Sequence, residues 1–274
     1  MTRSLITGIA ACALASNLLG AQTVDTKPRN TFFTPRDGAI AAGFLAVSAG
    51  ISIFDPRIAH FFRDTSLLHV REGEKLASIA THINESTLTV GGLGVWAIAR
   101  VIRAPTVADV AFHAAESVAA ASLTSQAIRG PLGRTRPLDA EHPYDDQYEF
   151  HFFRGFAHFE QRAFPSIHSA SGFAFASALV AQTKLRAPGA VWYVGVPAYA
   201  LAMTPGLSRM YLGQHWASDI FAGAFLGTFY GWRVVDYSHS HNTTPVDRIF
   251  LGSVNHLPTV STRGGTLIGW TMKF

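Results

Sequence analysis

Two residues in the C-terminal half of the chain have the types and spacing for nucleophilic attack on phosphorus. His215 and Asp219 are four apart in Ser208-Arg-Met-Tyr-Leu-Gly-Gln-His-Trp-Ala-Ser-Asp219, which predicts that they share one face of a helix from His215 to about Tyr237. An aspartate one turn away fixes the imidazole tautomer and leaves a lone pair on the other nitrogen. Taken alone, such a pair is more often structural. A metal site is not indicated here, because no third ligand lies at a recognisable spacing.

A second histidine lies at the expected start of another helix. In Pro165-Ser166-Ile167-His168-Ser169, Ser166 is placed to cap a helix that runs to about Leu185. The first turn of a helix offers free N–H groups and the positive end of the dipole, which suit an anion. His168 would then be close enough to protonate a departing alkoxide. For this stretch alone, an ordinary N-cap beside an incidental histidine is the better interpretation.

Three arginines lie close together in Arg129-Gly-Pro-Leu-Gly-Arg134-Thr-Arg136-Pro137. Pro131 and Pro137 are expected to stop the helix there. Arginine presents a planar fork of donors that matches phosphoryl oxygens, and 18 of the 22 basic residues of the chain are arginines. The alternatives are arginines that complement a helix dipole and a composition biased toward arginine.

Together, in this order, the three stretches resemble the signature of the type 2 phosphatidic acid phosphatase superfamily, which is related to vanadium haloperoxidases. The family pattern is K-x6-R-P, then P-S-G-H, then S-R-x5-H-x3-D, and the resemblance covers roughly residues 105–235. Arg129 stands where the family has lysine, which keeps the charge but changes the donor geometry. Ile167 stands where the family usually has glycine, so a helical φ is expected there.

The resemblance implies a role for each matching residue. His215 attacks phosphorus to form a phosphohistidine, Asp219 orients His215, and His168 protonates the leaving oxygen and then activates water. The phosphoryl oxygens are held by Arg129, Arg136, Arg209, Ser166 and the N–H of Ile167. Family members of this kind need no metal, so no cofactor is expected, although vanadate could bind as a phosphate mimic.

The elements that position these residues are predicted to be helices. Apolar stretches cover 38–54, 88–102 and 190–203, and Thr106 is expected to cap a helix that runs to about Ile128. Pro205-Gly206 is expected to break the helix before Ser208. The predicted fold is all-α, a helical bundle of the phosphatidic acid phosphatase/haloperoxidase type with a small C-terminal β appendage.

The ends of the chain carry separate expectations. Residues 1–21 read as a signal peptide, 22–37 as a linker, 38–240 as the helical domain, and 241–274 as a tail with short strands. An uncleaved anchor is the alternative for the first segment. In the tail, Thr266 to Phe274 alternates as a strand does and is expected to pair with Arg248 to Val254 in a hairpin. Without residues 1–21 the chain has no cysteine, which excludes a disulfide.

Two further groups of polar residues stand outside the signature. Asp109, His113 and Glu116 share a helix face, and His239-Ser-His241 lies near the end of the last helix. An interhelical polar face and an exposed helix exit are the favoured interpretations, ahead of a second active site and a metal site. The loop 138–164 holds aromatic residues that either form a satellite cluster beneath the loop or cover the substrate: Tyr144, Tyr148, Phe150, Phe152, Phe153, Phe156 and Phe159.

The amino-acid composition narrows the classes of function that the chain can have. Hydrophobic residues make up 48% of the chain and charged residues 15%, against roughly 25% charged in an average soluble domain. We expect a phosphatase acting on phosphate monoesters or pyrophosphates of a small molecule or lipid; a vanadate-dependent haloperoxidase and a non-enzymatic envelope protein are the alternatives. Basic runs interleaved with aromatics are absent, so nucleic acid is not an expected partner.

The protein is expected to be exported, either membrane-embedded with an extracytoplasmic site or soluble in the periplasm. Its oligomeric state is open.

Overall fold

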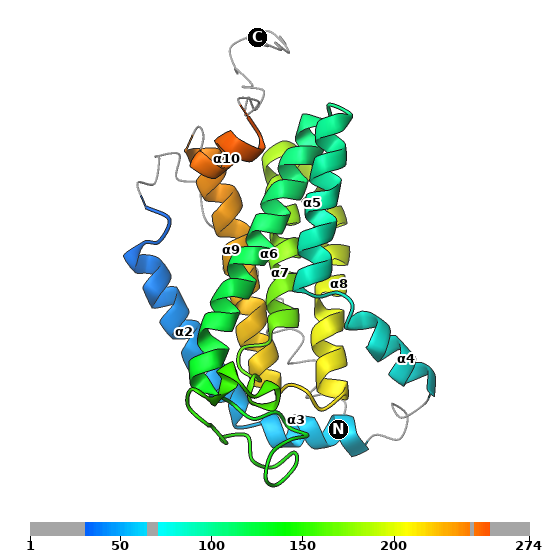
Figure 1. Ribbon diagram of the computed structural model, residues 1–274, viewed down its shortest axis with the longest axis vertical. Coiled ribbons are helices and arrows are strands. Elements are labelled where there is room, and N and C mark those ends of the chain that lie inside the picture. Colours follow the sequence, from blue (N-terminus) through cyan, green and yellow to red (C-terminus); the bar gives the residue numbers. More distant parts are fainter. Residues whose placement is uncertain (1–30, 65–70, 242–243, 253–274) are drawn as a thin grey trace. The chain divides into compact units, whose positions relative to one another are not determined.

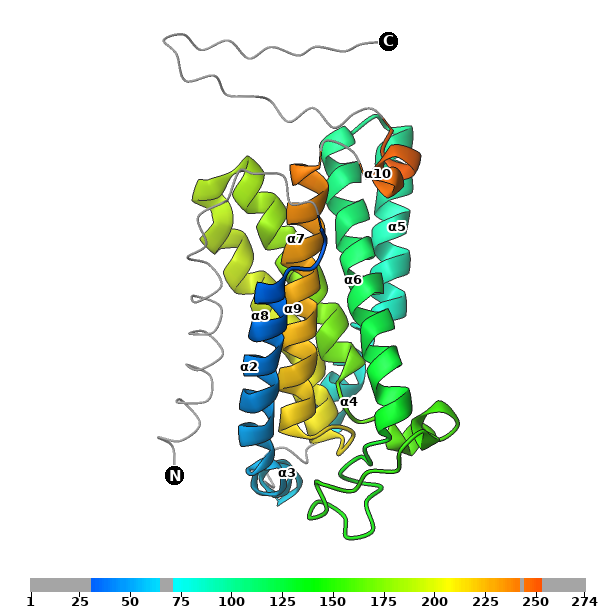
Figure 2. The same cartoon turned by 90° about the vertical axis from the view of Figure 1, so that its left-hand side faces the viewer.

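Long helices packed side by side form the bundle in the computed structural model, which describes residues 31–64, 71–241 and 244–252 (Figures 1 and 2). These helices are α5 (Glu85–Val101), α6 (Pro105–Leu132), α7 (Ile167–Arg186), α8 (Val191–Tyr211) and α9 (Ala217–Ser240). Helix α2 (Pro35–Ser52) lies along α9, α3 (Asp55–Asp64) crosses one end of the bundle, and α4 (Arg71–Ala80) packs on α8. The described residues therefore confirm the all-α helical bundle.

Helices α7 and α9 form the closest-packed pair of the bundle. Their interface is made of small residues, among them Ala170 and Ala174, which are fully buried. Gly227 faces α7 so closely that a Cβ atom there would collide with the carbonyl oxygen of Ala170. The two helices run parallel, so their N-terminal ends, at Ile167 and Ala217, lie at the same end of the bundle.

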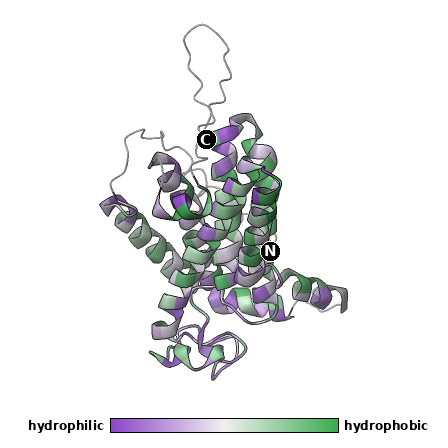
Figure 3. Ribbon diagram, turned by 45° about the horizontal axis from the view of Figure 1, so that its top comes forward, coloured by the Kyte–Doolittle hydropathy of each residue, from purple (hydrophilic) through white to green (hydrophobic). Residues whose placement is uncertain are grey.

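Large apolar side chains are exposed on the outside of the bundle, whose helices carry many hydrophobic residues among polar ones (Figure 3). Val101 of α5 exposes 82% of its surface, and large apolar side chains are also exposed on α8: Trp192, Tyr193, Val196 and Leu201. Exposed apolar area on this scale normally marks contact with lipid or another protein. Within the described residues no single helix has both the length and the apolar character to cross a bilayer, while α2 and α3, bent by 54° at their junction, meet that test as a pair.

Helix boundaries differ from the predictions at three places. Helix α6 begins at Pro105 with Ala104 as N-cap, so Thr106 is not the cap. It continues through Pro131 to Leu132, and Gly133, with a left-handed φ of 64°, is its C-cap. Helix α8 likewise continues through Pro205-Gly206 to Tyr211. Helix α9 begins at Ala217, so His215 precedes it. The starts of α6 and α9 follow local features, since Pro105 suits a first helical position and Asp219 accepts a hydrogen bond from the Trp216 N–H.

The C-terminal prediction was wrong for its first strand. Pro245–Phe250 forms a short helix, α10, capped by the side chain of Thr244, where strand pairing had been expected from Arg248 onward. The partner segment 266–274 lies outside the described residues, as do the expected signal peptide 1–21 and most of the expected linker. The end of that linker is helical, because α2 begins at Pro35.

Candidate active site

The three signature stretches meet at one end of the bundle, beside α3 (bottom of Figure 1). Arg129 lies in the last turn of α6, His168 in the first turn of α7, and Arg209 in the last turn of α8. His215 follows in the turn between α8 and α9. Segments nearly ninety residues apart are thereby joined, as the signature predicts.

His215 and Asp219 are in contact, although they do not lie on one helix as predicted. The imidazole Nδ1 is 3.6 Å from Asp219 Oδ2, and both side chains are almost completely buried. Asp219 is the third residue of α9, and its Oδ2 also accepts a hydrogen bond of 2.7 Å from the backbone N–H of Trp216. The carboxylate thus caps its own helix while facing Nδ1, which leaves Nε2 as the nitrogen that can react.

Asp219 is itself held by a buried charge network that the sequence did not reveal. Arg134 donates from Nη1 to Asp219 Oδ1 at 2.5 Å and from Nη2 to Asp55 Oδ2 at 2.8 Å. Ser218 donates from its backbone N–H to Asp55 Oδ1 at 2.9 Å. Arg134 was one of the three clustered arginines, but it points away from the phosphoryl position and braces the His215–Asp219 pair.

The start of α7 has the form expected of an anion site. Ser166 is its N-cap, and the Ser166 backbone N–H donates to the carbonyl of Asp219 at 3.0 Å, which ties this turn to α9. Ile167 is the first helical residue and is not among the described residues with positive φ. A β-branched residue is therefore unstrained at the position where the family has glycine, and its N–H belongs to the unpaired first turn.

Three guanidinium groups surround the same space. Arg129, Arg136 and Arg209 each have a buried Nε that makes no hydrogen bond within the described residues, as do Nδ1 of His168 and of His215. Gln214 Oε1 orients two of them, accepting from Arg136 Nη1 at 2.5 Å and from Arg209 Nη2 at 3.1 Å. Buried donors left unpaired in this number are costly unless an anion meets them.

Ser208, the serine of the third signature stretch, has a different position. Its hydroxyl donates to the carbonyl of Ala77 in α4 at 2.5 Å. The residue therefore attaches α4 to the end of α8 and does not face the phosphoryl position. Arg209 next to it is the member of the pair that reaches the site.

The site strongly favours negative charge. Burial, and then chiefly the positive charges of Arg209, Arg129 and Arg136, lower the pKa of His168 to about 3. Burial and the same three arginines also hold the pKa of His215 well below its usual value. Burial and repulsion by Arg209 and Arg129 lower the pKa of Arg136 to about 9, so it remains charged at neutral pH. Both imidazoles are thus neutral in the free site, beside three positive charges.

Opposing effects act on the pKa of the Asp219 carboxyl group. Burial raises the pKa of its carboxyl group, while the Arg134 guanidinium and the Trp216 N–H favour the ionised form. The short contact to Arg134 is charge-assisted, and it stabilises the carboxylate that has to face His215.

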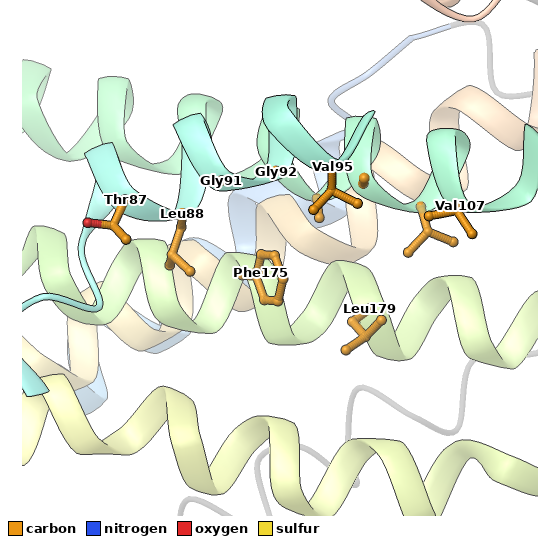
Figure 4. A pocket seen from close by; sticks show the side chains of 11 residues that line it. Thr87, Leu88, Gly91, Gly92, Val95, Val107, Phe175 and Leu179 are labelled. Carbon is orange, nitrogen blue, oxygen red and sulfur yellow. The ribbon is translucent and has the colours of Figure 1, made fainter. Parts of the chain in front are cut away.

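An apolar cavity of about 320 Å³ between α5, α6 and α7 is separate from this site (Figure 4). Its walls are formed by residues such as Leu88, Val95, Val107 and Phe175, and no charged side chain lines it. The cavity therefore offers no cationic side chain to a phosphoryl group, and Thr87 is the polar side chain among its lining residues.

The aromatic loop 138–164 covers the same end of the bundle. Tyr144 packs against the buried Trp216, as expected for a satellite cluster. The other aromatics are different, since five of them expose more than half of their surface: Tyr148, Phe152, Phe153, Phe156 and Phe159. The ring of Phe159 lies against the guanidinium of Arg136, with its centroid 3.9 Å from Cζ, and so connects the loop to the site.

Comparison with known proteins agrees with the signature. Residues 110–242 match the model of the PAP2 superfamily. A lipid A 4'-phosphatase from Bacteroides thetaiotaomicron is 32% identical over 113 residues, which are 41% of this chain and 46% of that protein. A lipid A 1-phosphatase from Porphyromonas gingivalis is 38% identical over 69 residues, 25% of this chain and 15% of that protein. The chain thus aligns with less than half the length of each of these curated relatives.

Among solved structures, the crystal structure of a transmembrane PAP2 type phosphatidylglycerolphosphate phosphatase from Bacillus subtilis covers 66% of this chain and 94% of its own. The two chains share 19% identity, with a TM-score of 0.34.

Proposed function

The chain belongs to the PAP2 superfamily, and from that premise we propose that it hydrolyses phosphate monoesters through a phosphohistidine formed at His215. The observation that supports this most is the meeting of two neutral, buried imidazoles with three guanidinium groups whose buried Nε atoms are unpaired. That arrangement suits a phosphoryl group, since the anion supplies acceptors for the donors and compensates their charge.

In the first step, Nε2 of His215 attacks phosphorus and the P–O bond to the alcohol breaks. The electron pair of that bond leaves with the alcohol oxygen, which takes a proton from His168. Asp219, held by Arg134, stabilises the positive charge that develops on the His215 ring. Arg129, Arg136, Arg209, Ser166 and the N–H of Ile167 hold the remaining phosphoryl oxygens.

In the second step, water replaces the enzyme at phosphorus. His168, now neutral, takes a proton from the water as its oxygen attacks, and the P–N bond breaks with its electron pair returning to Nε2. The proton on His168 then passes to the departing inorganic phosphate or to solvent, and the free site again holds a neutral His168.

The low pKa of His168 determines how the proton for the first step arrives. In the free site His168 is neutral at pH 7, since its pKa is about 3. A phosphate monoester has a second pKa of about 6, so it can bind as its monoanion and transfer its remaining proton to His168. The pKa of His168 rises once the phosphoryl charge lies beside it. The reactive complex then holds a dianion and a protonated His168.

We infer that the substrate is a phosphorylated lipid. Three observations support a lipid substrate: the exposed apolar side chains on α5 and α8, the exposed phenylalanines of the loop beside Arg136, and the lipid phosphatases among the relatives. Export directed by residues 1–21, followed by attachment to the membrane through these apolar faces, fits the same observations. Alkaline carbonate treatment of membranes tests the attachment; release of the protein into the supernatant would contradict it.

Replacement of His215 by alanine tests the proposed chemistry. We expect His215→Ala to lose turnover of a chromogenic phosphate ester and of lipid phosphates, measured as released inorganic phosphate. His142→Ala is the matched control, because that histidine side chain is 72% exposed on the loop and should be dispensable. Turnover retained by His215→Ala would end the proposal.

A further inference from the structure

A second buried polar cluster lies at the opposite end of the bundle, beside α10 (top of Figure 1). It brings together the two polar groups that the proposed function does not use. Asp109 and His113 come from α6, His239 from the last turn of α9, and Asp247 from α10. His113 and Asp247 are fully buried, and the side chain of Asp109 is 9% exposed.

Asp109, His113 and His239 place ligand atoms within 4.8 Å of one another. Asp109 Oδ1 is 3.4 Å from His113 Nδ1, and Asp109 Oδ2 is 3.3 Å from His239 Nε2. Neither Asp109 Oδ1 nor His239 Nε2 makes a hydrogen bond within the described residues. Each separation, to a different oxygen of Asp109, exceeds a normal hydrogen bond and is of the length that separates two ligand atoms of one ion with bonds of about 2.0–2.1 Å, the usual Zn–N and Zn–O lengths.

Hydrogen bonds with Arg186, Gln182 and Asp247 fix the orientation of Asp109 and His113. Arg186 pairs with Asp109 Oδ2 and with Gln182 Oε1. With its oxygen engaged, the Gln182 amide donates through Nε2 to His113 Nδ1 at 3.0 Å, so the ring proton lies on Nε2, which faces Asp247 Oδ1 at 3.1 Å. A ring proton donated to a carboxylate, with the other nitrogen facing the ion, is the usual state of a metal-binding histidine.

The charge of the cluster points the same way. Three carboxylates, from Asp109, Glu116 and Asp247, meet one guanidinium, from Arg186, and Oε2 of Glu116 and Oδ2 of Asp247 make no hydrogen bond within the described residues. Histidines bind a metal ion as neutral imidazoles, and in that bound state three carboxylates against one guanidinium leave two negative charges for a divalent cation to balance.

We propose that Asp109, His113 and His239 bind a divalent transition-metal ion, best zinc, at the end of the bundle remote from the candidate active site. Two imidazoles and one carboxylate are a zinc-type donor set, with water completing the coordination. The ion would join α6 to α9 and, through Asp247, to α10. The amide of Gln182 competes with it for the lone pair of His113 Nδ1. This site takes no part in the proposed hydrolysis and does not rest on it.

Metal analysis of the full-length chain without an affinity tag tests the site. The protein is stripped with a chelator, equilibrated with Zn²⁺, and its bound zinc is measured by mass spectrometry. We expect one zinc per chain in the unmodified protein and in His241→Gln, and none in His239→Gln. His241 is the matched control, since it lies two residues further along and stacks on Tyr237 outside the ligand set. No zinc in the unmodified protein, zinc retained by His239→Gln, or zinc lost from His241→Gln would each overturn the proposal.

A second pair of variants separates ligation from loss of folding. Asp247→Asn should weaken zinc binding about 10- to 100-fold, because it removes the carboxylate partner of His113. Gln182→Met should instead tighten binding, since it removes the competing donor while keeping the side-chain volume. Damage to the fold cannot increase affinity. Unchanged or weaker zinc binding by Gln182→Met would contradict the assigned His113 lone pair and with it the site.

Discussion

Asp55 is the residue whose replacement tests the bracing of the proposed nucleophile most sharply. It is fully buried in α3, outside the signature, and it accepts three hydrogen bonds: from Arg134, from the Ser218 backbone and from the Ser218 hydroxyl. Asp55→Asn keeps an oxygen for the Ser218 N–H but turns an amide donor toward the Arg134 guanidinium. Arg134 would then be left with Asp219 as its only carboxylate among the described residues.

The expected cost follows from this geometry. Removing one partner of a buried ion pair costs about 3–5 kcal/mol. Because Asp219 still neutralises Arg134, we expect the lower figure, about 3 kcal/mol, which lowers the melting temperature by roughly 6–12 °C at the usual 2–4 °C per kcal/mol for a domain of this size. Arg134 should also hold Asp219 less firmly, so kcat should fall about 10- to 100-fold with KM little changed, as when other outer-shell partners are lost.

Thermal unfolding in detergent and steady-state turnover of a chromogenic ester measure both effects. Asp64→Asn is the matched control, since Asp64 ends the same helix with a side chain that is 60% exposed, and a change there should be nearly neutral. If Asp55→Asn unfolded and turned over like Asp64→Asn, the network would not support Asp219 and the reasoning would be refuted.

Three further predictions concern the site and the packing beneath it. First, kcat/KM should decline above about pH 6, because the monoester then loses the proton that it has to supply to the neutral His168. Activity should persist well below pH 6.5, because the lowered pKa of His215 keeps the nucleophile unprotonated there. A pH–rate profile that rises toward pH 8 would contradict this. Second, Ile167→Gly should retain activity within a few-fold, because the helical backbone there needs no positive φ, whereas a loss of more than a hundredfold in kcat would show that the Ile167 side chain takes part. Third, Gly227→Ala should lower stability by about 1–3 kcal/mol in thermal unfolding, because its methyl group meets the carbonyl of Ala170, while Gly189→Ala, with open space around it, should not; equal stability of the two variants would contradict the packing.

The resemblance to the family signature selected Arg129, Arg136, His168 and His215, and the structure brings these four residues to one end of the bundle, while their roles stay predictions. The sequence was less successful with the helices that carry them. The ends of α6 and α8 were misplaced because Pro131 and Pro205 are tolerated within packed helices, where neighbouring helices supply the stability that the lost hydrogen bond removes.

Most of the contacts that sequence analysis missed join residues far apart in the chain. Asp55 is 79 residues before Arg134 and showed no local pattern beyond the proline that follows it. Gln214 adjoins His215, and its amide oxygen could have been suspected as an arginine partner. The convergence of the Asp109 face with His239 needed the close packing of α6 against α9, and no spacing rule predicts such a contact between separate helices.

The central claim is that phosphorus becomes bonded to His215, and a rapid-quench experiment with a ³²P-labelled ester measures this directly. Trypsin separates the two histidines, since cleavage after Arg209 and Arg233 leaves His215 as the single histidine of its peptide, and cleavage after Arg162 and Lys184 does the same for His168. We predict an acid-labile, alkali-stable label on the 210–233 peptide. Label on the 163–184 peptide, or turnover with no labelled peptide at any quench time, would contradict the account.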